Sequence, residues 1–150
     1  MNSKLLNPQR IIIILRGVSN SGKSTFAEYL KDIFYWNVDK SCEICCADDF
    51  FENEKGDYTF DASKLDLAHR LCKNKFTKSL QNGVELVIVA NTNIKPSHFD
   101  FYIETAKEYG YTLFSLVMEK RFEGGDNGHD VPEKSLQLME NNIKISLKLR

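Results

Sequence analysis

The stretch GVSNSGKST, Gly17–Thr25, constrains this chain more than any other part of its sequence. It matches the spacing G-x-x-x-x-G-K-[ST], and it stands between the apolar run RIIIIL at residues 10–15 and a helix-like segment. A loop of this kind wraps an anion with successive backbone N–H groups, and the positive end of the helix dipole faces the same anion. Motif and context together predict a phosphate-binding loop between a buried strand and a helix.

The predicted ligand of this loop is a nucleoside triphosphate. Lys23 is placed to reach the β- and γ-phosphates, and the hydroxyl of Ser24 is placed to ligate magnesium. The predicted nucleotide-binding residues are Gly17, Ser19, Asn20, Ser21, Gly22, Lys23, Ser24 and Thr25. We therefore expect ATP and Mg²⁺ as cofactors.

The rest of the chain alternates between strand-like and helix-like segments. The predicted strands are short, apolar and mostly β-branched, and lie at 10–15, 43–47, 84–90 and 111–118. The predicted helices have apolar residues at helical spacing or helix start and stop signals, and lie at 22–35, 62–82, 96–110 and 132–149. This alternation favours a parallel sheet covered on both faces. We predict a single α/β domain over 1–150, with a three-layer P-loop NTPase fold, a mostly parallel sheet of four to five strands and helices on both faces.

Composition narrows the class of protein further. The chain has 150 residues, of which 42% are hydrophobic and 27% charged, and a formal net charge of -1, which is typical of a soluble globular domain. A nucleic-acid substrate would therefore be held by a local patch rather than by the whole surface. The sequence shows neither a membrane-spanning stretch nor a signal-peptide pattern. We expect a monomer without membrane contact in the cytoplasm, or in the nucleus of a eukaryotic or viral system.

Cysteines crowd the second predicted strand. Cys42, Cys45 and Cys46 lie within SCEICCA, and Cys72 lies in the following helix. A zinc site normally needs a second ligand pair at suitable spacing, so reduced core thiols are the favoured interpretation and metal or redox chemistry is the alternative.

Two adjacent carboxylates, Asp48 and Asp49, follow the second predicted strand in the sequence ADDF. The carboxyl ends of parallel strands form the edge at which open α/β folds bind their ligands. Asp48 is therefore a candidate base for the proton of an attacking hydroxyl, and it can also contact Mg²⁺. A solvated turn acid and a helix cap are the structural alternatives. Asp49 is a candidate substrate-binding residue.

The third predicted strand ends in VIVANTN at residues 87–93, without the aspartate that usually follows such a strand in proteins that bind ATP and magnesium. Ala90 and Asn91 occupy the relevant positions, and an asparagine is a weaker, neutral oxygen ligand for magnesium. Asn91 and Asn93 are candidates to hydrogen-bond phosphate, water or an acceptor. Magnesium would then depend on Ser24, Asp48, phosphates and water.

Five stretches together resemble a known family: LRGVSNSGKST, ADDFF, GDYTFDASKLDLAHRLCKNKF, NTN and GHDVP. The sequence resembles small P-loop kinases related to the phage polynucleotide 5′-kinases, the kinase-like domain of the myelin cyclic-nucleotide phosphodiesterase and the animal proteins that bind the Nedd-four ubiquitin ligase. It is most similar to the Nedd-four-binding group of AAA-type ATPases and kinases. The resemblance implies that Asp48 activates a 5′-hydroxyl of a single-stranded nucleic acid. It also raises His69 as a residue of the acceptor groove, with packing inside the helix as the alternative.

The sequence departs from this family at two further places. Phe51 stands where the phage enzymes carry an arginine that holds the 3′-phosphate of the substrate, so Phe50 and Phe51 either stack on a base or belong to the core. The segment before the last helix, EKRFEGGDNGHDV, offers Arg121 as the candidate arginine finger, with a surface charge as the alternative.

These observations predict an ATP-dependent kinase that transfers the γ-phosphate to a hydroxyl, most plausibly the 5′-OH of a polynucleotide or oligonucleotide. Two alternatives stay open. One is a nucleotide-binding module with weak or no catalysis, and the other is a P-loop kinase that acts on a small molecule.

Overall fold

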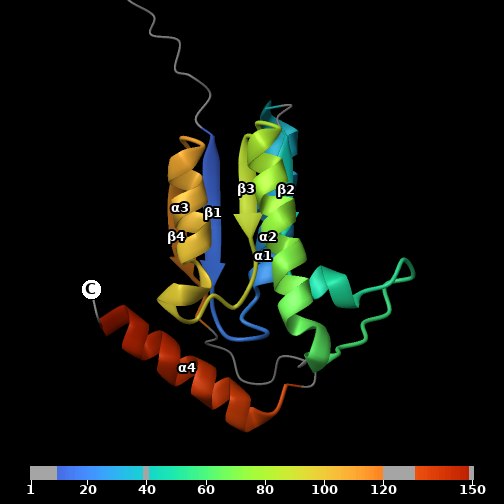
Figure 1. The fold of residues 1–150 in the computed structure, drawn as a ribbon, viewed down its shortest axis with the longest axis vertical. Helices are drawn as coiled ribbons and strands as arrows, with labels where there is room; N and C mark the ends of the chain where they lie inside the picture. The colour runs from blue at the N-terminus through green and yellow to red at the C-terminus, as the bar shows by residue number, and fades with distance from the viewer. Residues whose placement is uncertain (1–9, 39–40, 120–130, 149–150) are drawn as a thin grey trace, which may run out of the picture.

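A parallel sheet forms the centre of the computed structural model, which describes residues 10–38, 41–119 and 131–148. In these residues the strand order is β2-β3-β1-β4. The strands are β1 (Ile11–Arg16), β2 (Cys42–Cys45), β3 (Leu86–Val89) and β4 (Thr112–Val117). β1 pairs in parallel with β3 and β4, and β2 pairs in parallel with β3, so the carboxyl ends of the strands share one edge (Figure 1).

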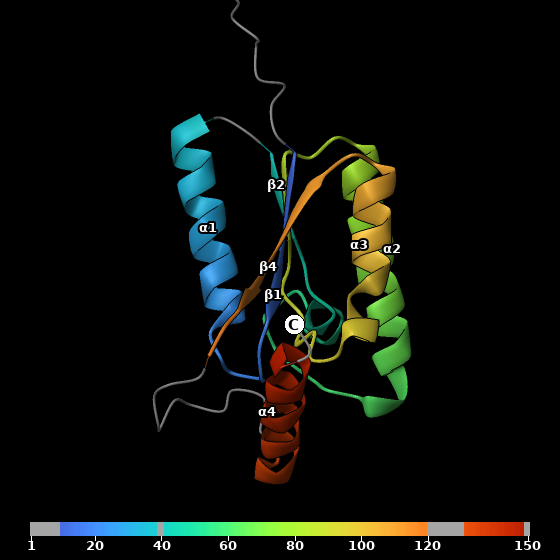
Figure 2. The same ribbon diagram turned by 90° about the vertical axis from the view of Figure 1, so that its left-hand side faces the viewer.

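Helices cover both faces of the sheet, as the alternating pattern predicted. Helix α1 (Lys23–Val38) lies on one face, and α2 (Leu65–Gln81) and α3 (Asp100–Glu108) lie together on the other (Figure 2). Alternate strand residues supply the two cores: Ile12 and Val87 pack on the side of α2 and α3, and Leu15 and Ile88 on the side of α1. The α/β prediction is therefore confirmed, with four strands in the described residues.

Short 3-10 helices stand after β2 and directly before α2 and α3, where η2 and η3 take the first turns of the helices expected at 62–82 and 96–110. They are η1 (Asp48–Phe51), η2 (Ala62–Lys64) and η3 (Pro96–His98). The carboxylate of Asp61 accepts the N–H of Ser63 at 3.0 Å and so caps η2, just ahead of α2. Gly83 and Gly110 adopt positive φ angles of 72° and 71° just beyond α2 and α3, as expected of helix stop signals.

Helix α4 (Glu133–Lys148) does not cover a sheet face but crosses below the carboxyl ends of the strands (Figure 1). Ile143 of α4 packs with Val18 of the predicted phosphate loop and with Ile94, which follows β3. The last helix therefore lies against the phosphate loop rather than beside the sheet.

A buried arginine connects these parts. Arg16, the last residue of β1, is only 1% exposed. Its Nε donates to the carbonyl of Asn93 (2.9 Å), and its Nη2 donates to the carbonyl of Ile94 (3.2 Å) and to Ser146 Oγ on α4 (2.7 Å). The guanidinium also lies 4.5 Å from the centre of the Phe99 ring. Arg16 therefore joins β1 to the segment after β3 and to α4, and it is not free to clamp a phosphate.

We predict that Arg16→Met lowers the free energy of unfolding by about 3 kcal/mol, because the carbonyls of Asn93 and Ile94 would stay buried without their donor. Urea unfolding of both proteins would measure the change. The control is Arg70→Met, which alters an exposed arginine on α2 and should stay within about 0.5 kcal/mol of the parent. The prediction is wrong if Arg16→Met lowers the free energy of unfolding no more than Arg70→Met does.

Candidate active site

The loop between β1 and α1 has the backbone geometry that a phosphate cradle needs. The N–H of Gly17 donates to the carbonyl of Thr92 at 2.9 Å, which fixes the start of the loop against the segment after β3. A Cβ on Gly17 would lie 2.7 Å from the carbonyl oxygen of Met118, so no larger residue fits there. Asn20 and Gly22 have positive φ angles of 60° and 90°, which turn the loop back toward the start of α1.

Lys23 reaches back into this loop. Its ammonium donates to the carbonyls of Gly17 (3.0 Å) and Val18 (2.7 Å) and to Ser21 Oγ (3.3 Å). Burial lowers the pKa of Lys23 to about 8, and the negative charges of Cys46 and Asp48, when ionised, oppose that shift. The loop carbonyls are neutral partners, so an incoming phosphate would bind the ammonium of Lys23 more strongly than they do.

A cavity of about 290 Å³ opens above the loop. Its lining combines loop and helix residues with three residues from the ends of β2 and β3: Ser19, Asn20, Gly22, Lys23, Ser24, Thr25, Asp48, Ala90 and Thr92. Most of the predicted nucleotide-binding residues therefore line one space. Of the others, Gly17 forms the base of the loop, and Ser21 is hydrogen-bonded to the ammonium of Lys23.

Asp48 lies on the wall of this cavity as the first residue of η1. The hydroxyl of Tyr58 donates to its carboxylate at 3.5 Å, and the carboxylate is otherwise exposed. Asp48 also lines a second cavity, which shares Ser19 and Thr92 with the first. The candidate base therefore stands between a phosphate-binding space and a neighbouring space.

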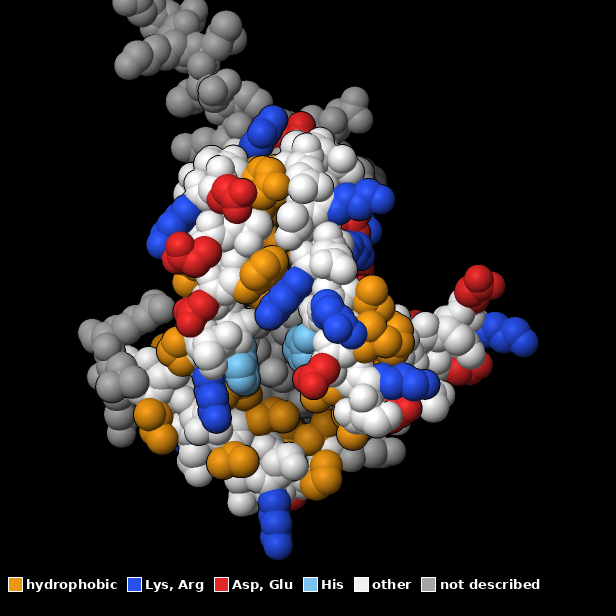
Figure 3. Space-filling model, in the orientation of Figure 1, with side chains coloured by type: hydrophobic (Ala, Val, Ile, Leu, Met, Phe, Trp, Pro, Cys, Tyr) orange, Lys and Arg blue, Asp and Glu red, His pale blue; other side chains and the backbone are white. Residues whose placement is uncertain are grey.

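The second cavity has a volume of about 360 Å³ and a more apolar wall. Its residues come from the phosphate loop, from the segments after β2 and β3, from α2 and from α4 with the two residues before it: Ser19, Ala47, Asp48, Tyr58, Phe60, Leu65, His69, Asn91, Thr92, Val131, Pro132, Ser135 and Met139. Figure 3 shows hydrophobic side chains gathered at this lower end, where α4 lies below α2 and α3. His69 is half-buried here, and burial lowers its pKa against the opposing charge of Asp48. The cavity suits a flat apolar group with polar edges.

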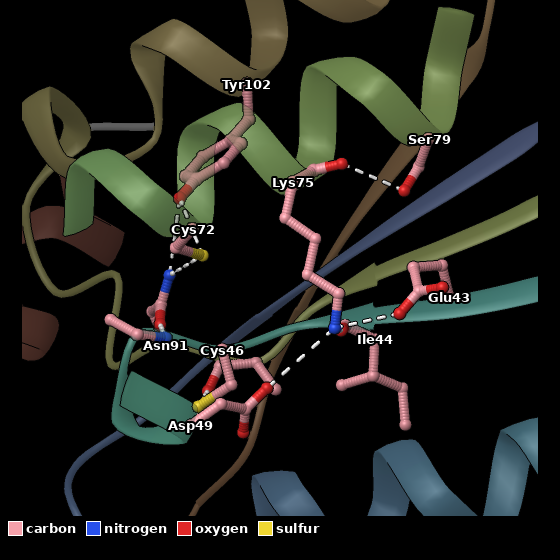
Figure 4. Close-up of polar contacts among 11 residues, drawn as sticks. Glu43, Ile44, Cys46, Asp49, Cys72, Lys75, Ser79, Asn91 and Tyr102 are labelled. Carbon is pink, nitrogen blue, oxygen red and sulfur yellow. Dashed lines mark hydrogen bonds and ion pairs between the residues drawn. The ribbon is translucent and has the colours of Figure 1, made fainter. Parts of the chain in front are cut away.

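Asp49 points away from both cavities. Its carboxylate lies 4.0 Å from the ammonium of Lys75, which also contacts Glu43 at 2.8 Å and the carbonyl of Ile44 at 2.6 Å (Figure 4). Burial raises the pKa of Asp49, and Lys75 opposes that shift. Asp49 thus joins a cluster that ties α2 to β2, and the structure does not bring it to the predicted substrate site.

Asn91 and Asn93 use their side chains inside the protein. The carbonyl oxygen of Asn91 accepts the N–H of Ala47 at 2.8 Å, and its amide donates to the hydroxyl of Tyr102 at 3.3 Å (Figure 4). The amide of Asn93 donates to the backbone carbonyls of Leu15 (2.9 Å) and Asn91 (3.2 Å). These bonds hold the strand ends, and of the two residues only Asn91 also lines the second cavity. Binding of phosphate or acceptor by either asparagine stays a prediction.

The two phenylalanines after Asp49 differ in exposure. Phe51 is 6% exposed and packs on Phe60 at 5.1 Å between ring centres, so it is a core residue rather than a surface on which a base can stack. Phe50 is 38% exposed, but it borders neither of the two cavities described above. Arg121, the candidate arginine finger, lies outside the described residues.

Sequence reasoning missed most of the apolar wall of the second cavity. Tyr58 and Phe60 stand in the G-x-Y-x-F part of the family resemblance, which was the available signal for them. Val131 and Pro132 stand in the GHDVP part of the same resemblance, whereas Met139 carried no such signal, because its place depends on where α4 lies against the loop. Its role could be found only from the three-dimensional arrangement.

Magnesium would have few protein ligands in this site. Ser24 and Asp48 line the same cavity, whereas Ala90 supplies no oxygen from its side chain. Within the described ranges there is no group of three or more His, Cys, Asp or Glu side chains able to hold a metal. The residues present therefore fit a magnesium ion that arrives with a nucleotide and keeps several waters.

The cysteines form no site of their own. All four are free thiols, and Cys42, Cys45 and Cys72 are buried. Burial raises the pKa of the Cys42 thiol to about 11 and that of Cys46 to about 12, which keeps both protonated at neutral pH. The geometry matches reduced core thiols.

No family model matches the sequence, but solved structures share its fold. A chain of the Pnkp1/Rnl/Hen1 RNA repair complex matches with a TM-score of 0.73 at 18% identity, over 100% of this chain and 49% of that one. Mycobacterium tuberculosis APS kinase CysC in complex with AMPPNP and APS matches with 0.59 at 17% identity, over 87% and 73%. Chaetomium thermophilum Kti12 in complex with ADP-AlF3 matches with 0.59 at 12% identity, over 87% and 79%.

This chain therefore has a P-loop NTPase fold, shared with these structures, and its loop Gly17–Thr25 keeps the full G-x-x-x-x-G-K-[ST] spacing. It spans about half the length of the RNA repair chain that it matches. In the part of the chain that the structure describes, no helix is both long and apolar enough to cross a bilayer.

We predict that nucleotide affinity falls as the pH rises above 8. The protonated ammonium of Lys23 pairs with phosphate, and its pKa of about 8 means that the free protein loses this proton in mildly alkaline solution. Binding must then restore the proton, which weakens affinity by up to about tenfold per pH unit. Calorimetry with ADP between pH 7 and 9.5, in EDTA to remove metal ions, would measure this loss of affinity. Lys23→Met should bind weakly at every pH, and a flat profile for the parent would contradict the prediction.

We also predict that Ala90→Asp strengthens magnesium-dependent nucleotide binding by on the order of tenfold, whereas Asn91→Asp does not. Position 90 borders the phosphate cavity, but the side chain of Asn91 turns toward Ala47 and Tyr102. Asn91→Asp should instead destabilise the fold, because it buries a carboxylate where an amide donated. Magnesium titrations of ATP affinity compare the two variants, and equal gains would refute the assignment of the two positions.

Proposed function

We propose that this protein is an ATP-dependent kinase that transfers the γ-phosphate of ATP to the 5′-hydroxyl of a polynucleotide or oligonucleotide. The observation that carries the proposal is the position of Asp48 on the wall shared by two cavities. One cavity is formed by the phosphate-binding loop, and the other is an apolar space large enough for a nucleobase and its sugar. A carboxylate between donor and acceptor is where phosphoryl transfer needs a base.

In the proposed mechanism, the loop amides and Lys23 hold the β- and γ-phosphates in the first cavity. The acceptor hydroxyl enters from the second cavity and donates a hydrogen bond to the carboxylate of Asp48. Asp48 receives the proton as the new phosphate ester forms, while the bond between the γ-phosphorus and the β,γ-bridging oxygen breaks and ADP leaves. The Tyr58 hydroxyl, 3.5 Å from that carboxylate, holds it in place. Magnesium, held through Ser24, Asp48 and waters, would neutralise charge on the phosphates. Arg121 is proposed to close over them.

Several observations support a nucleic-acid acceptor. Tyr58 and Phe60 give the second cavity aromatic walls, on which a base can stack irrespective of its sequence. The sequence resembles the polynucleotide 5′-kinases and, among them, the Nedd-four-binding group. One of the similar structures belongs to an RNA repair complex. Action as a cytoplasmic monomer stays a prediction from the sequence.

A small-molecule acceptor is the second candidate. It is favoured by the similarity to an APS kinase and by the modest volume of the second cavity, about 360 Å³. A nucleoside or another compact hydroxyl compound would fill that volume. The missing acid at Ala90 favours slow transfer to either acceptor. If the transfer rate falls to zero, the protein is a module that only binds nucleotide.

We predict that Asp48→Asn reduces transfer from labelled ATP to a 5′-OH oligonucleotide by roughly 10²–10⁴-fold, since it removes the base. ATP affinity should change only a few-fold. Asp49→Asn is the matched control, because Asp49 faces Lys75 rather than either cavity, and it should keep most of the activity. The proposal fails if the parent labels no oligonucleotide, or if Asp48→Asn labels one as fast as the parent does.

A further inference from the structure

We propose that a row of basic residues beside the second cavity binds the backbone phosphates of the acceptor strand. The row consists of His69 and Lys73 on α2, Lys95 before η3 and His98 within η3, and we call it the basic row. This inference rests on the proposed function and deepens it, because it specifies an acceptor longer than one nucleotide. Figure 3 shows Lys, Arg and His side chains gathered around a hollow between α2 and α3.

The basic row begins at the active site. His69 lines the second cavity together with Asp48, so one end of the row adjoins the candidate base. The backbone N–H of Lys95 donates to Nδ1 of His98 at 3.5 Å, which places these two residues side by side. Positive charge on Lys95 and on His69 lowers the pKa of His98, so both lie near it. Lys73 stands one turn of α2 beyond His69 and acts on it in the same way. The four side chains therefore form a continuous path leading away from the acceptor cavity.

The two lysines of the row are not neutralised by the protein. In the described residues, Lys64, Lys75 and Lys107 form ion pairs with carboxylates, whereas Lys73 and Lys95 form none. The ammonium of Lys73 instead lies 5.2 Å from the centre of the Phe101 ring, which holds it in place without cancelling its charge. Lys73, placed over an aromatic ring, and the exposed Lys95 thus have no acidic partner in an ion pair among the described residues, which suits an external polyanion.

The histidines add hydrogen-bond donors to these charges. Burial is the main cause that lowers the pKa of His69 and of His98, and cationic neighbours lower both further. A neutral imidazole still donates one N–H to a phosphate oxygen. The carboxylates whose charges act on His69 are Asp48 and Asp66, at the end of the row near the cavity, where a 5′-hydroxyl rather than a phosphate would lie.

A nucleic-acid strand fits this surface better than an anionic membrane does. The cavity would take the 5′-terminal base, and the basic row would take the phosphates that follow it. The apolar and basic parts of this surface thus match the bases and phosphates of a strand. The net charge of the protein is only -1 and gives no general attraction to an acidic surface. The protein would then favour an oligonucleotide over a nucleoside because only the oligonucleotide has phosphates that reach the basic row.

The test measures binding of a fluorescent single-stranded oligonucleotide with a 5′-OH over a range of salt concentrations. Lys73→Gln combined with Lys95→Gln should lower the slope of log affinity against log salt by roughly 1.4, about 0.7 for each lost phosphate contact. The control is Lys31→Gln combined with Lys78→Gln, which removes the same charge from α1 and from the far end of α2. Unchanged nucleotide affinity in both proteins shows that they are folded.

The outcomes separate this inference from the proposed function. The inference holds if the Lys73/Lys95 variant alone loses salt-dependent binding and has a raised KM for an oligonucleotide but not for a nucleoside. It is overturned if the slope is unchanged, if the control falls equally, or if the same lysines are needed only for anionic vesicles. Binding that depends on the basic row without any phosphate transfer would instead refute the proposed kinase activity and leave the basic row as a strand-binding site.

Discussion

The parallel pairing of β1 with β3 is the constraint on which the site depends. It brings the end of β1, which opens the phosphate loop, beside the segment that leaves β3, and the bond from Gly17 N–H to the Thr92 carbonyl joins them. β2 pairs with β3 on its other side, so Asp48 leaves the sheet at the same edge. The phosphate loop, Asp48 and the wall of the second cavity therefore converge although they are far apart in sequence.

Sequence patterns predicted the elements and the phosphate loop because both depend on short-range features. Glycines at fixed spacing, a lysine at the start of a helix and runs of β-branched residues are local signals. Asp48 was predicted for a similar reason, since it directly follows a strand. The orientation of its neighbours was not predictable, because one step along the chain turns a side chain to another face, as the contrast between Asp48 and Asp49 shows.

The missing acid after β3 has a structural counterpart. Asn91 would be a poor magnesium ligand, but its amide does what a carboxylate alone could not: it accepts from Ala47 and donates to Tyr102. That pair of bonds ties the exits of β2 and β3 to α3, directly before Asp48. Asn91 thus fixes the backbone directly before Asp48, and a magnesium ion would depend on Ser24, Asp48, phosphate and water.

Arg16 has one more consequence. It precedes the first glycine of the phosphate loop and also holds Ser146 on α4, while Met139 of the same helix forms part of the acceptor wall and contacts Ser19 of the loop at 3.8 Å. Moving α4 would therefore act on the phosphate loop at two points, its start and Ser19. The width of the second cavity and the shape of the phosphate loop are mechanically linked in this arrangement, so a change in one is felt in the other.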